Sequence, residues 1–172
     1  MAGKLVYWFE EGGEEHRAIL GGKGAGLAEM TRIGLPVPPG FTITTQACKL
    51  YYQSDRKLPD SLKQDIKDYI KGLEQKTGKH FGGDQNPLLV SVRSGAPISM
   101  PGMMDTILNL GLNDRSVKGL YEATQDLRFS YDCYRRFIQM FGNVVLGIPH
   151  SEFERVFSQL KKDERVTQDQ DV

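Results

Sequence analysis

The apolar positions of the chain follow two different spacings. Alternating or short continuous apolar runs, which are typical of β-strands, occur in the part of the chain that ends near Gly111. They predict strands at four places: residues 5–9, 41–44, 87–92 and 107–110. Apolar residues three and four positions apart, which are typical of amphipathic helices, lie between these strands. They predict helices over residues 27–33 and 45–54 and over a longer segment that begins at Asp60.

Beyond Asn113 only the helical spacing remains. One apolar stripe there repeats at intervals of four and three residues, so it needs a partner helix or sheet to cover it. The stripe consists of Leu127, Tyr131, Tyr134, Ile138, Phe141 and Val145. Pro149 ends this helix, and another amphipathic helix follows it. We therefore expect the α/β (α+β) fold class, with an α/β lobe over residues 1–111 and a helical subdomain over residues 112–172.

Composition excludes several classes of protein. The chain has 172 residues, of which 39% are apolar, and its 22 basic and 22 acidic residues give a formal net charge of zero. A nucleic-acid-binding protein would normally show a basic excess, so we expect no nucleic-acid partner. No apolar run approaches the roughly 20 residues of a membrane span, and Glu10 and Glu11 come too early for a signal peptide. We expect a soluble, cytoplasmic protein.

A glycine-rich segment, Gly21-Gly22-Lys23-Gly24-Ala25-Gly26, precedes the first predicted helix. Glycines let backbone N–H groups approach a phosphate, and a helix N-terminus adds a favourable field for an anion. Lys23 would add a mobile positive charge. The segment is not a Walker A loop, because Gly24 stands where Ser or Thr should follow the lysine. A glycine-rich turn with a solvated lysine explains the same residues.

Arg93 stands at the end of the strand predicted over residues 87–92. A strand end would fix the direction of the guanidinium group, whose planar fork matches phosphate oxygens. The alternative is an arginine that forms an ion pair with Asp105 or Asp114. The residues by themselves leave both possibilities open.

The loop after Arg93 is rich in methionine, with Met100, Met103 and Met104 around a Pro101-Gly102 turn. Methionine side chains are flexible and apolar, so they can cover a base or repack against a moving partner. Gly102 lets the backbone approach a ligand. The same residues could instead fill a gap in the core.

The remaining polar candidates have simpler interpretations. His16, His80 and His150 are isolated from one another and are expected to be solvated or locally hydrogen-bonded. Cys48 and Cys133 fall inside helical patterns and are expected to be small buried thiols. Arg135 and Arg136 are expected to form a solvated pair, with docking of another domain as the alternative.

Taken together, these segments resemble the N-terminal part of the pyruvate phosphate dikinase family. The segments that carry the resemblance are residues 20–24 with 27–30, residues 38–42, residues 88–95 with 100–111, and residues 134–140. The long central match, from Val-Arg-Ser to Met-Pro-Gly-Met-Met-Asp, is the most specific. The related phosphoenolpyruvate synthases share the glycine–lysine segment and the Val-Arg-Ser strand end, but they resemble the chain less over Met100 to Asp105.

The resemblance implies a fold and a reaction. It implies the N-terminal part of an ATP-grasp nucleotide-binding domain, in an enzyme that interconverts ATP, phosphate and pyruvate with AMP, diphosphate and phosphoenolpyruvate through a phosphohistidine. Lys23 and Arg93 would be the catalytic cations. The residues implied to bind ATP are Gly21, Gly22, Lys23, Gly24, Arg93, Pro101, Gly102, Met103 and Asp105. The family also uses Mg²⁺, whose ligands are expected outside this chain.

The resemblance also implies what is absent. The phosphohistidine of the family lies in a Gly-Gly-Met-Thr-Ser-His context, and no histidine of this chain has it. The barrel that binds pyruvate and phosphoenolpyruvate is absent as well. We therefore expect a fragment that is inactive alone, from an enzyme that is a homodimer when full length. The alternatives are a phosphoenolpyruvate synthase fragment and a non-catalytic interaction module.

Overall fold

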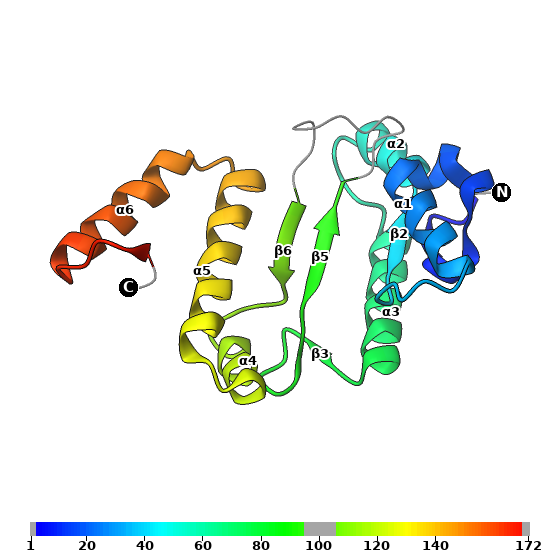
Figure 1. Ribbon diagram of the computed structural model, residues 1–172. Helices are drawn as coiled ribbons and strands as arrows, with labels where there is room; N and C mark the ends of the chain where they lie inside the picture. The colour runs from blue at the N-terminus through cyan, green and yellow to red at the C-terminus, as the bar shows by residue number, and fades with distance from the viewer. Residues whose placement is uncertain (1–2, 95–105, 170–172) are drawn as a thin grey trace.

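The computed structural model describes residues 3–94 and 106–169, which form small two-stranded sheets and longer helices (Figure 1). Two 3₁₀ turns, η1 (Phe9–Glu11) and η2 (Glu14–His16), follow the first strand. The strands are β1 (Val6–Trp8), β2 (Phe41–Ile43), β3 (His80–Phe81), β4 (Pro87–Leu88), β5 (Val90–Arg93) and β6 (Thr106–Leu110). The helices are α1 (Arg17–Arg32), α2 (Thr45–Gln53), α3 (Asp60–Thr77), α4 (Ser116–Thr124), α5 (Leu127–Val144) and α6 (His150–Asp163).

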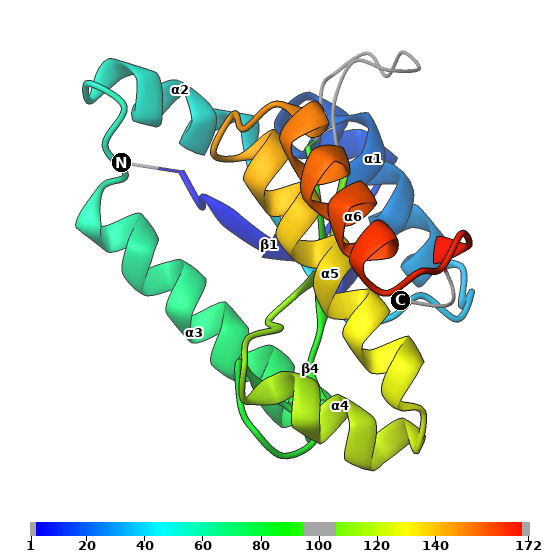
Figure 2. The same ribbon diagram turned by 90° about the vertical axis from the view of Figure 1, so that its left-hand side faces the viewer.

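The first sheet joins β1 and β2 in antiparallel register, with Val6 opposite Ile43. Successive side chains of a strand point to opposite faces, and both faces of β1 are covered. Val6 packs in a buried cluster with Leu62 of α3, whereas Tyr7 packs against a cluster on α1. Figure 2 accordingly shows α1 and α3 on opposite sides of β1. The helical stripe predicted from Asp60 onward is confirmed, because its residues Leu62 and Leu73 are buried.

Aromatic rings close the edge of this sheet. The rings of Trp8 and Tyr69 lie 4.5 Å apart between centroids, and Phe41 meets Trp8 edge-on at 5.9 Å. The Tyr69 hydroxyl donates a hydrogen bond of 2.8 Å to the backbone carbonyl of Val6. A side chain at Gly72 would collide with the Trp8 ring, so this glycine allows α3 to lie close to β1. These contacts hold α3 against β1.

The third sheet, formed by β5 and β6, places Arg93. β5 and β6 pair in antiparallel register, with Val90 opposite Leu110 and Arg93 opposite Thr106, and the register shifts between Val90 and Val92. The continuous buried strand predicted over residues 87–92 is wrong. Pro87 and Leu88 are buried in β4, which pairs with β3 in parallel, but β5 becomes exposed towards its end, where Val92 is 45% exposed.

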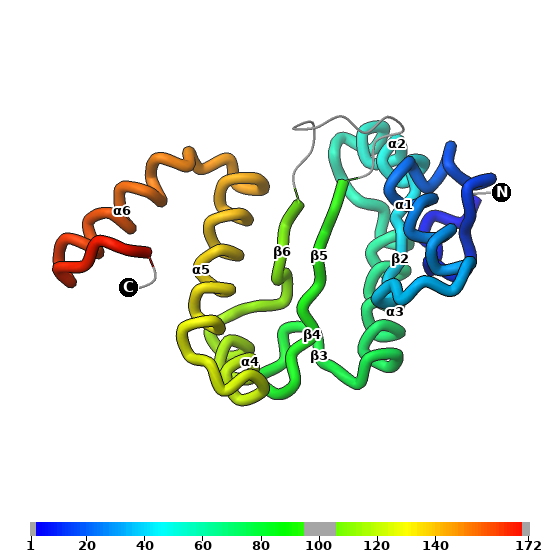
Figure 3. Tube along the Cα trace, in the orientation of Figure 1, coloured from blue at the N-terminus to red at the C-terminus, as the bar shows by residue number. Residues whose placement is uncertain are grey.

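The described elements after Gly111 are all helices, and the chain passes from α1, α2 and α3 through the β5–β6 pair to α5 and α6 (Figure 3). The stripe predicted on α5 is only partly covered. Tyr134 and Phe141 are half-buried, and α5 packs along β6. Four other members of the stripe are exposed: Leu127, Tyr131, Ile138 and Val145. Within the described part of the chain, no helix is both long and apolar enough to cross a membrane.

Candidate functional site

The glycine-rich segment lies inside α1 rather than before it. The prediction of a loop followed by a helix at Leu27 is wrong, because helical structure already begins at Arg17. The helix is interrupted at one residue, Gly21, whose φ of 72° and ψ of 170° are not helical. A residue with a Cβ atom is strained at these backbone angles, so glycine is needed at position 21. Apolar spacing could not reveal the helix, since glycines contribute no side chain to a periodic pattern.

The interruption creates a second helix N-terminus in the middle of the segment. Gly22, Lys23 and Gly24 are the first residues after the break, so their N–H groups lie where a helix has unsatisfied donors and a positive dipole end. These N–H groups are the backbone donors that the prediction of a phosphate-binding segment requires. The arrangement can bind an anion such as a phosphate through backbone donors.

Lys23 is half-buried on α1, and no hydrogen bond or ion pair joins it to any of the residues that the structure describes. Gly26 lies three positions further on, and therefore on a neighbouring part of the helix face. A Cβ atom built at Gly26 meets no atom within 4 Å. The described residues therefore leave open space at Gly26, one helical turn after Lys23.

Arg93 ends β5 with an exposed side chain. One alternative, an ion pair with Asp114, is wrong: the Asp114 carboxylate instead accepts a 2.7 Å hydrogen bond from the Tyr134 hydroxyl. The other, a pair with Asp105, involves a residue outside those described. Beside Arg93, the buried hydroxyl oxygen of Ser94 has no hydrogen-bond partner in the described parts of the chain.

The structure describes only part of the predicted site. It places Lys23 and the glycines on α1 and Arg93 on β5, and no hydrogen bond or ion pair links these two elements at either cation in residues 3–94 and 106–169. Six residues of the methionine-rich loop, which was predicted to cover a base, fall outside the described residues: Met100, Pro101, Gly102, Met103, Met104 and Asp105. Across the described ranges, no group of three or more His, Cys, Asp or Glu side chains could hold a metal ion.

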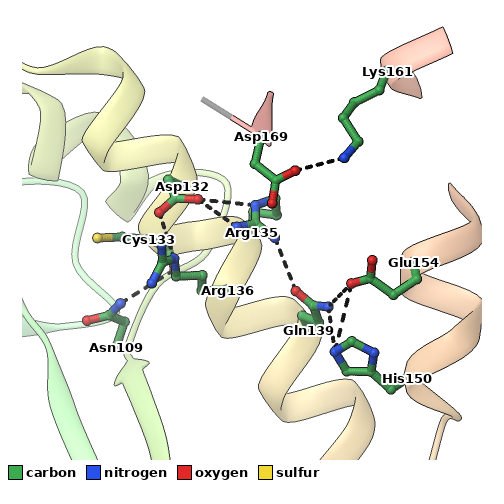
Figure 4. Close-up of polar contacts among 10 residues, drawn as sticks. All are labelled: Asn109, Asp132, Cys133, Arg135, Arg136, Gln139, His150, Glu154, Lys161 and Asp169. Carbon is green, nitrogen blue, oxygen red and sulfur yellow. Dashed lines mark hydrogen bonds and ion pairs between the residues drawn. The ribbon is translucent and has the colours of Figure 1, made fainter. Parts of the chain in front are cut away.

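A polar cluster between α5 and α6 was not predicted (Figure 4). The prediction of a solvated pair holds for Arg136, whose side chain is 65% exposed, but Arg135 is half-buried, and both arginines contact Asp132 at 2.7 Å. Arg135 also lies over the ring of Phe157 on α6, at 4.8 Å from its centroid. The spacing of Asp132 and the two arginines is a sequence signal for an ion pair within one helix. The contact with Phe157 depends on how α6 packs and has no such signal.

Other contacts of the cluster also tie α6 to α5. Gln139 lies 3.2 Å from the ring nitrogen of His150 and 3.4 Å from the carboxylate of Glu154, so His150 is locally hydrogen-bonded as expected. Cys133, on the same helix, is half-buried, and burial raises the pKa of its thiol. Cys48 is exposed on α2, so its prediction as a buried thiol is wrong.

The Asp132 carboxyl has a pKa below its ordinary value. Partial burial by itself would raise this pKa, but the hydrogen bond from Arg135 and the positive charges of Arg135 and Arg136 together outweigh burial. A carboxyl whose pKa is lower in the folded state than in the unfolded state stabilises the fold above its unfolded pKa. That contribution is lost as the pH falls through the lowered folded value.

Replacement of Asp132 with asparagine should therefore lower stability at pH 7, because both arginines lose their anionic partner. It should also remove part of the fall in melting temperature that is expected for the unaltered chain below about pH 4. Thermal unfolding followed by circular dichroism from pH 7 to acid measures both effects. Asp65→Asn, at an exposed position of α3, is the matched control. Parallel pH profiles for the Asp132 variant and the unaltered chain would contradict the assignment.

The chain is similar to known proteins that define first its class of protein and then its family. The class is that of nucleotide-binding domains: a family described as "Pyruvate phosphate dikinase, AMP/ATP-binding domain" matches residues 17–57 and 53–163, which include both Lys23 and Arg93. The chain belongs to this family.

The curated relatives agree with the family. The chain is 53% identical to pyruvate, phosphate dikinase of Clostridium symbiosum, over 98% of this chain and 19% of that protein. It is 50% identical to the Entamoeba histolytica protein of the same name, over 97% of this chain and 19% of the relative. A chloroplastic relative from Flaveria pringlei is 52% identical over 98% of this chain and 18% of its own length. The chain thus spans about a fifth of the length of these relatives.

Proposed function

We propose that the chain is the ATP-phosphate-binding segment of a pyruvate phosphate dikinase, which interconverts ATP, phosphate and pyruvate with AMP, diphosphate and phosphoenolpyruvate. One observation carries the proposal. The family match covers both Lys23 and Arg93, and neither cation has a carboxylate partner among the described residues. Cations held on secondary structure without a protein partner are suited to bind the oxygens of a polyphosphate.

Each group has a role in this proposal. The N–H groups after Gly21 and the Lys23 ammonium bind phosphate oxygens, and the Arg93 guanidinium forms a bidentate contact with the phosphoryl group in transfer. Phosphoryl transfer depends mainly on positioning and on charge neutralisation, which these groups supply. Residues 100–105 complete the proposal as a lid over the nucleotide. Mg²⁺ would neutralise charge on the phosphates, and the proposal assigns its ligands to other parts of the full-length enzyme.

The proposal includes an architecture. Residues 1–111 form the phosphate-binding lobe of an ATP-grasp domain, and residues 112–172 form its helical subdomain. In the full-length enzyme, a phosphohistidine domain and a barrel that binds pyruvate and phosphoenolpyruvate are the partners of this segment, in a cytoplasmic homodimer. The names of the chloroplastic relatives leave room for another compartment in other members of the family.

A chimera tests the proposed function directly. The present chain replaces the matching segment of the Clostridium symbiosum relative, to which it is 53% identical. We expect the purified chimera to form phosphoenolpyruvate with release of AMP and diphosphate. Release of free phosphate in place of diphosphate would indicate a phosphoenolpyruvate synthase. A folded chimera without the ATP half-reaction, beside an active parent enzyme, would favour a non-catalytic module.

The 172-residue chain alone is expected to have no dikinase activity and to bind ATP weakly at best, because the phosphohistidine and the barrel are missing from it. Calorimetric titration with ATP and an assay with pyruvate measure the two properties. Turnover of pyruvate and ATP by the purified chain would contradict this expectation, irrespective of the activity of the chimera.

A further inference from the structure

The corner between β2 and α2 contacts α1 on both sides of the break at Gly21. Before the break, the Thr45 hydroxyl donates a 3.1 Å hydrogen bond to the backbone carbonyl of Ala18, which is 27 residues away in sequence. After the break, Gly24 packs against Thr42. A Cβ atom at Gly24 would lie 2.8 Å from the Thr42 methyl group and 3.0 Å from its hydroxyl oxygen.

The carbonyl of Ala18 needs a partner because of the break itself. In an uninterrupted helix this carbonyl would accept a hydrogen bond from the N–H group of Gly22, four residues later. The extended ψ of 170° at Gly21 turns the following peptide group out of the helical direction. The break therefore lies between the Ala18 carbonyl and the Gly22 N–H group, and the Thr45 hydroxyl donates to that carbonyl. Among the described residues, the Gly22 N–H group has no hydrogen-bond partner outside α1.

The hydroxyl groups of Thr45 and of its neighbour Thr44 bond to different elements. The Thr44 hydroxyl is buried and caps α2, accepting from the N–H group of Ala47 at 3.4 Å. Its role is internal to α2. Thr45 is the first residue of the same helix, yet its hydroxyl points to another element and bonds to α1. A hydrogen bond that spans 27 residues and ends beside the break has no role in forming α2.

We propose that Thr45 is a positioning residue that, with Thr42 packed at Gly24, holds the break in α1 open and thereby orients the Gly22 N–H group and Lys23 towards phosphate. This inference rests on the proposed function for its effect on ATP. Its structural part concerns the backbone at Ala18 and Gly22 and can be measured without any nucleotide.

The first measurement is nuclear magnetic resonance on the 172-residue chain with Thr45→Val, which keeps the shape of the side chain but removes the donor. We expect the Ala18 carbonyl carbon and the Gly22 amide to shift, and Thr45→Ser to retain the signals of the unaltered chain. Thr77→Val is the matched control, because the Thr77 hydroxyl also donates to a backbone carbonyl, that of Leu73, but within α3. Signals of Ala18 and Gly22 that do not move in Thr45→Val would overturn the proposal.

The second measurement uses the chimera and the ATP half-reaction. Thr45→Val is expected to raise the KM for ATP on the order of 3- to 10-fold, the loss of about one hydrogen bond. Thr45→Ser and Thr77→Val should keep the KM of the unaltered chimera, and exchange between pyruvate and phosphoenolpyruvate should be unchanged throughout. A purely structural role would lower the melting temperature of Thr45→Val and leave its KM for ATP unaltered, which would also overturn the proposal.

Lys23→Met in the same chimera separates this inference from the function on which it rests. A raised KM for ATP in Lys23→Met, beside an unchanged one in Thr45→Val, contradicts only the role of Thr45. An unchanged KM in Lys23→Met contradicts the proposed phosphate site itself. In that case the effect assigned to Thr45 on ATP fails with it, even if the resonances at Ala18 and Gly22 move.

Discussion

Replacement of Arg93 with leucine should suppress the ATP half-reaction of the chimera by at least about 10²-fold, the loss typical of removing a group that stabilises transition-state charge. Arg93 lies at the exposed end of β5, and its backbone is paired with Thr106, so leucine fits the same strand position. The variant should therefore fold. Exchange between pyruvate and phosphoenolpyruvate, which does not use ATP, should remain nearly intact. Separate assays of the two half-reactions provide the measurement.

Two further variants sharpen the interpretation of Arg93. Arg93→Lys keeps the positive charge but loses the planar fork, so its activity should lie between those of the leucine variant and the unaltered chimera. Arg155→Leu removes an exposed arginine of α6 that pairs only with Glu152 of the same helix in the described part of the chain, and it should leave both half-reactions unaltered. Equal losses in both half-reactions of Arg93→Leu would make Arg93 a structural residue.

Replacement of Gly21 with alanine is expected to destabilise the chain by about 1–3 kcal/mol, because its φ of 72° and ψ of 170° are essentially restricted to glycine. The alternative for the variant is to straighten α1, which would remove the helix N-terminus at Gly22. The free energy of unfolding from urea denaturation measures the first effect. In the chimera, the KM for ATP measures the second.

Gly26→Ala is the matched control for stability. Gly26 lies in the same helix, has no positive φ, and a Cβ atom there meets nothing within 4 Å. Alanine favours a helix over glycine by up to about 1 kcal/mol, so this variant should be as stable as the unaltered chain or more so. If the two alanine variants have equal stability, the break at Gly21 does not require glycine, and the geometry assigned to the phosphate-binding segment is wrong.

Part of the candidate site could be predicted from sequence because it depends on local rules. An apolar run followed by arginine predicts a strand end, and Arg93 is indeed the last residue of β5. Glycines next to a lysine indicate a place where backbone can approach an anion, and the break at Gly21 lies there. The errors arose where packing overrides local preference. Glycines disfavour helices, but Gly24 is buried in α1, where the lack of a side chain allows close packing against Thr42 of β2.

The sequence by itself determined that the described strands lie before Gly111 and that helices follow it, the buried stripe of α3 and the residue types that can bind phosphate, because periodicity and the chemistry of side chains are properties of neighbouring residues. Only the tertiary structure decided three features. It decided that α1 is interrupted at a single glycine, that Thr45 reaches the freed carbonyl of Ala18, and that Arg135 lies over Phe157. Each of these depends on residues from separate elements that meet in space, and no spacing along one segment encodes such a meeting.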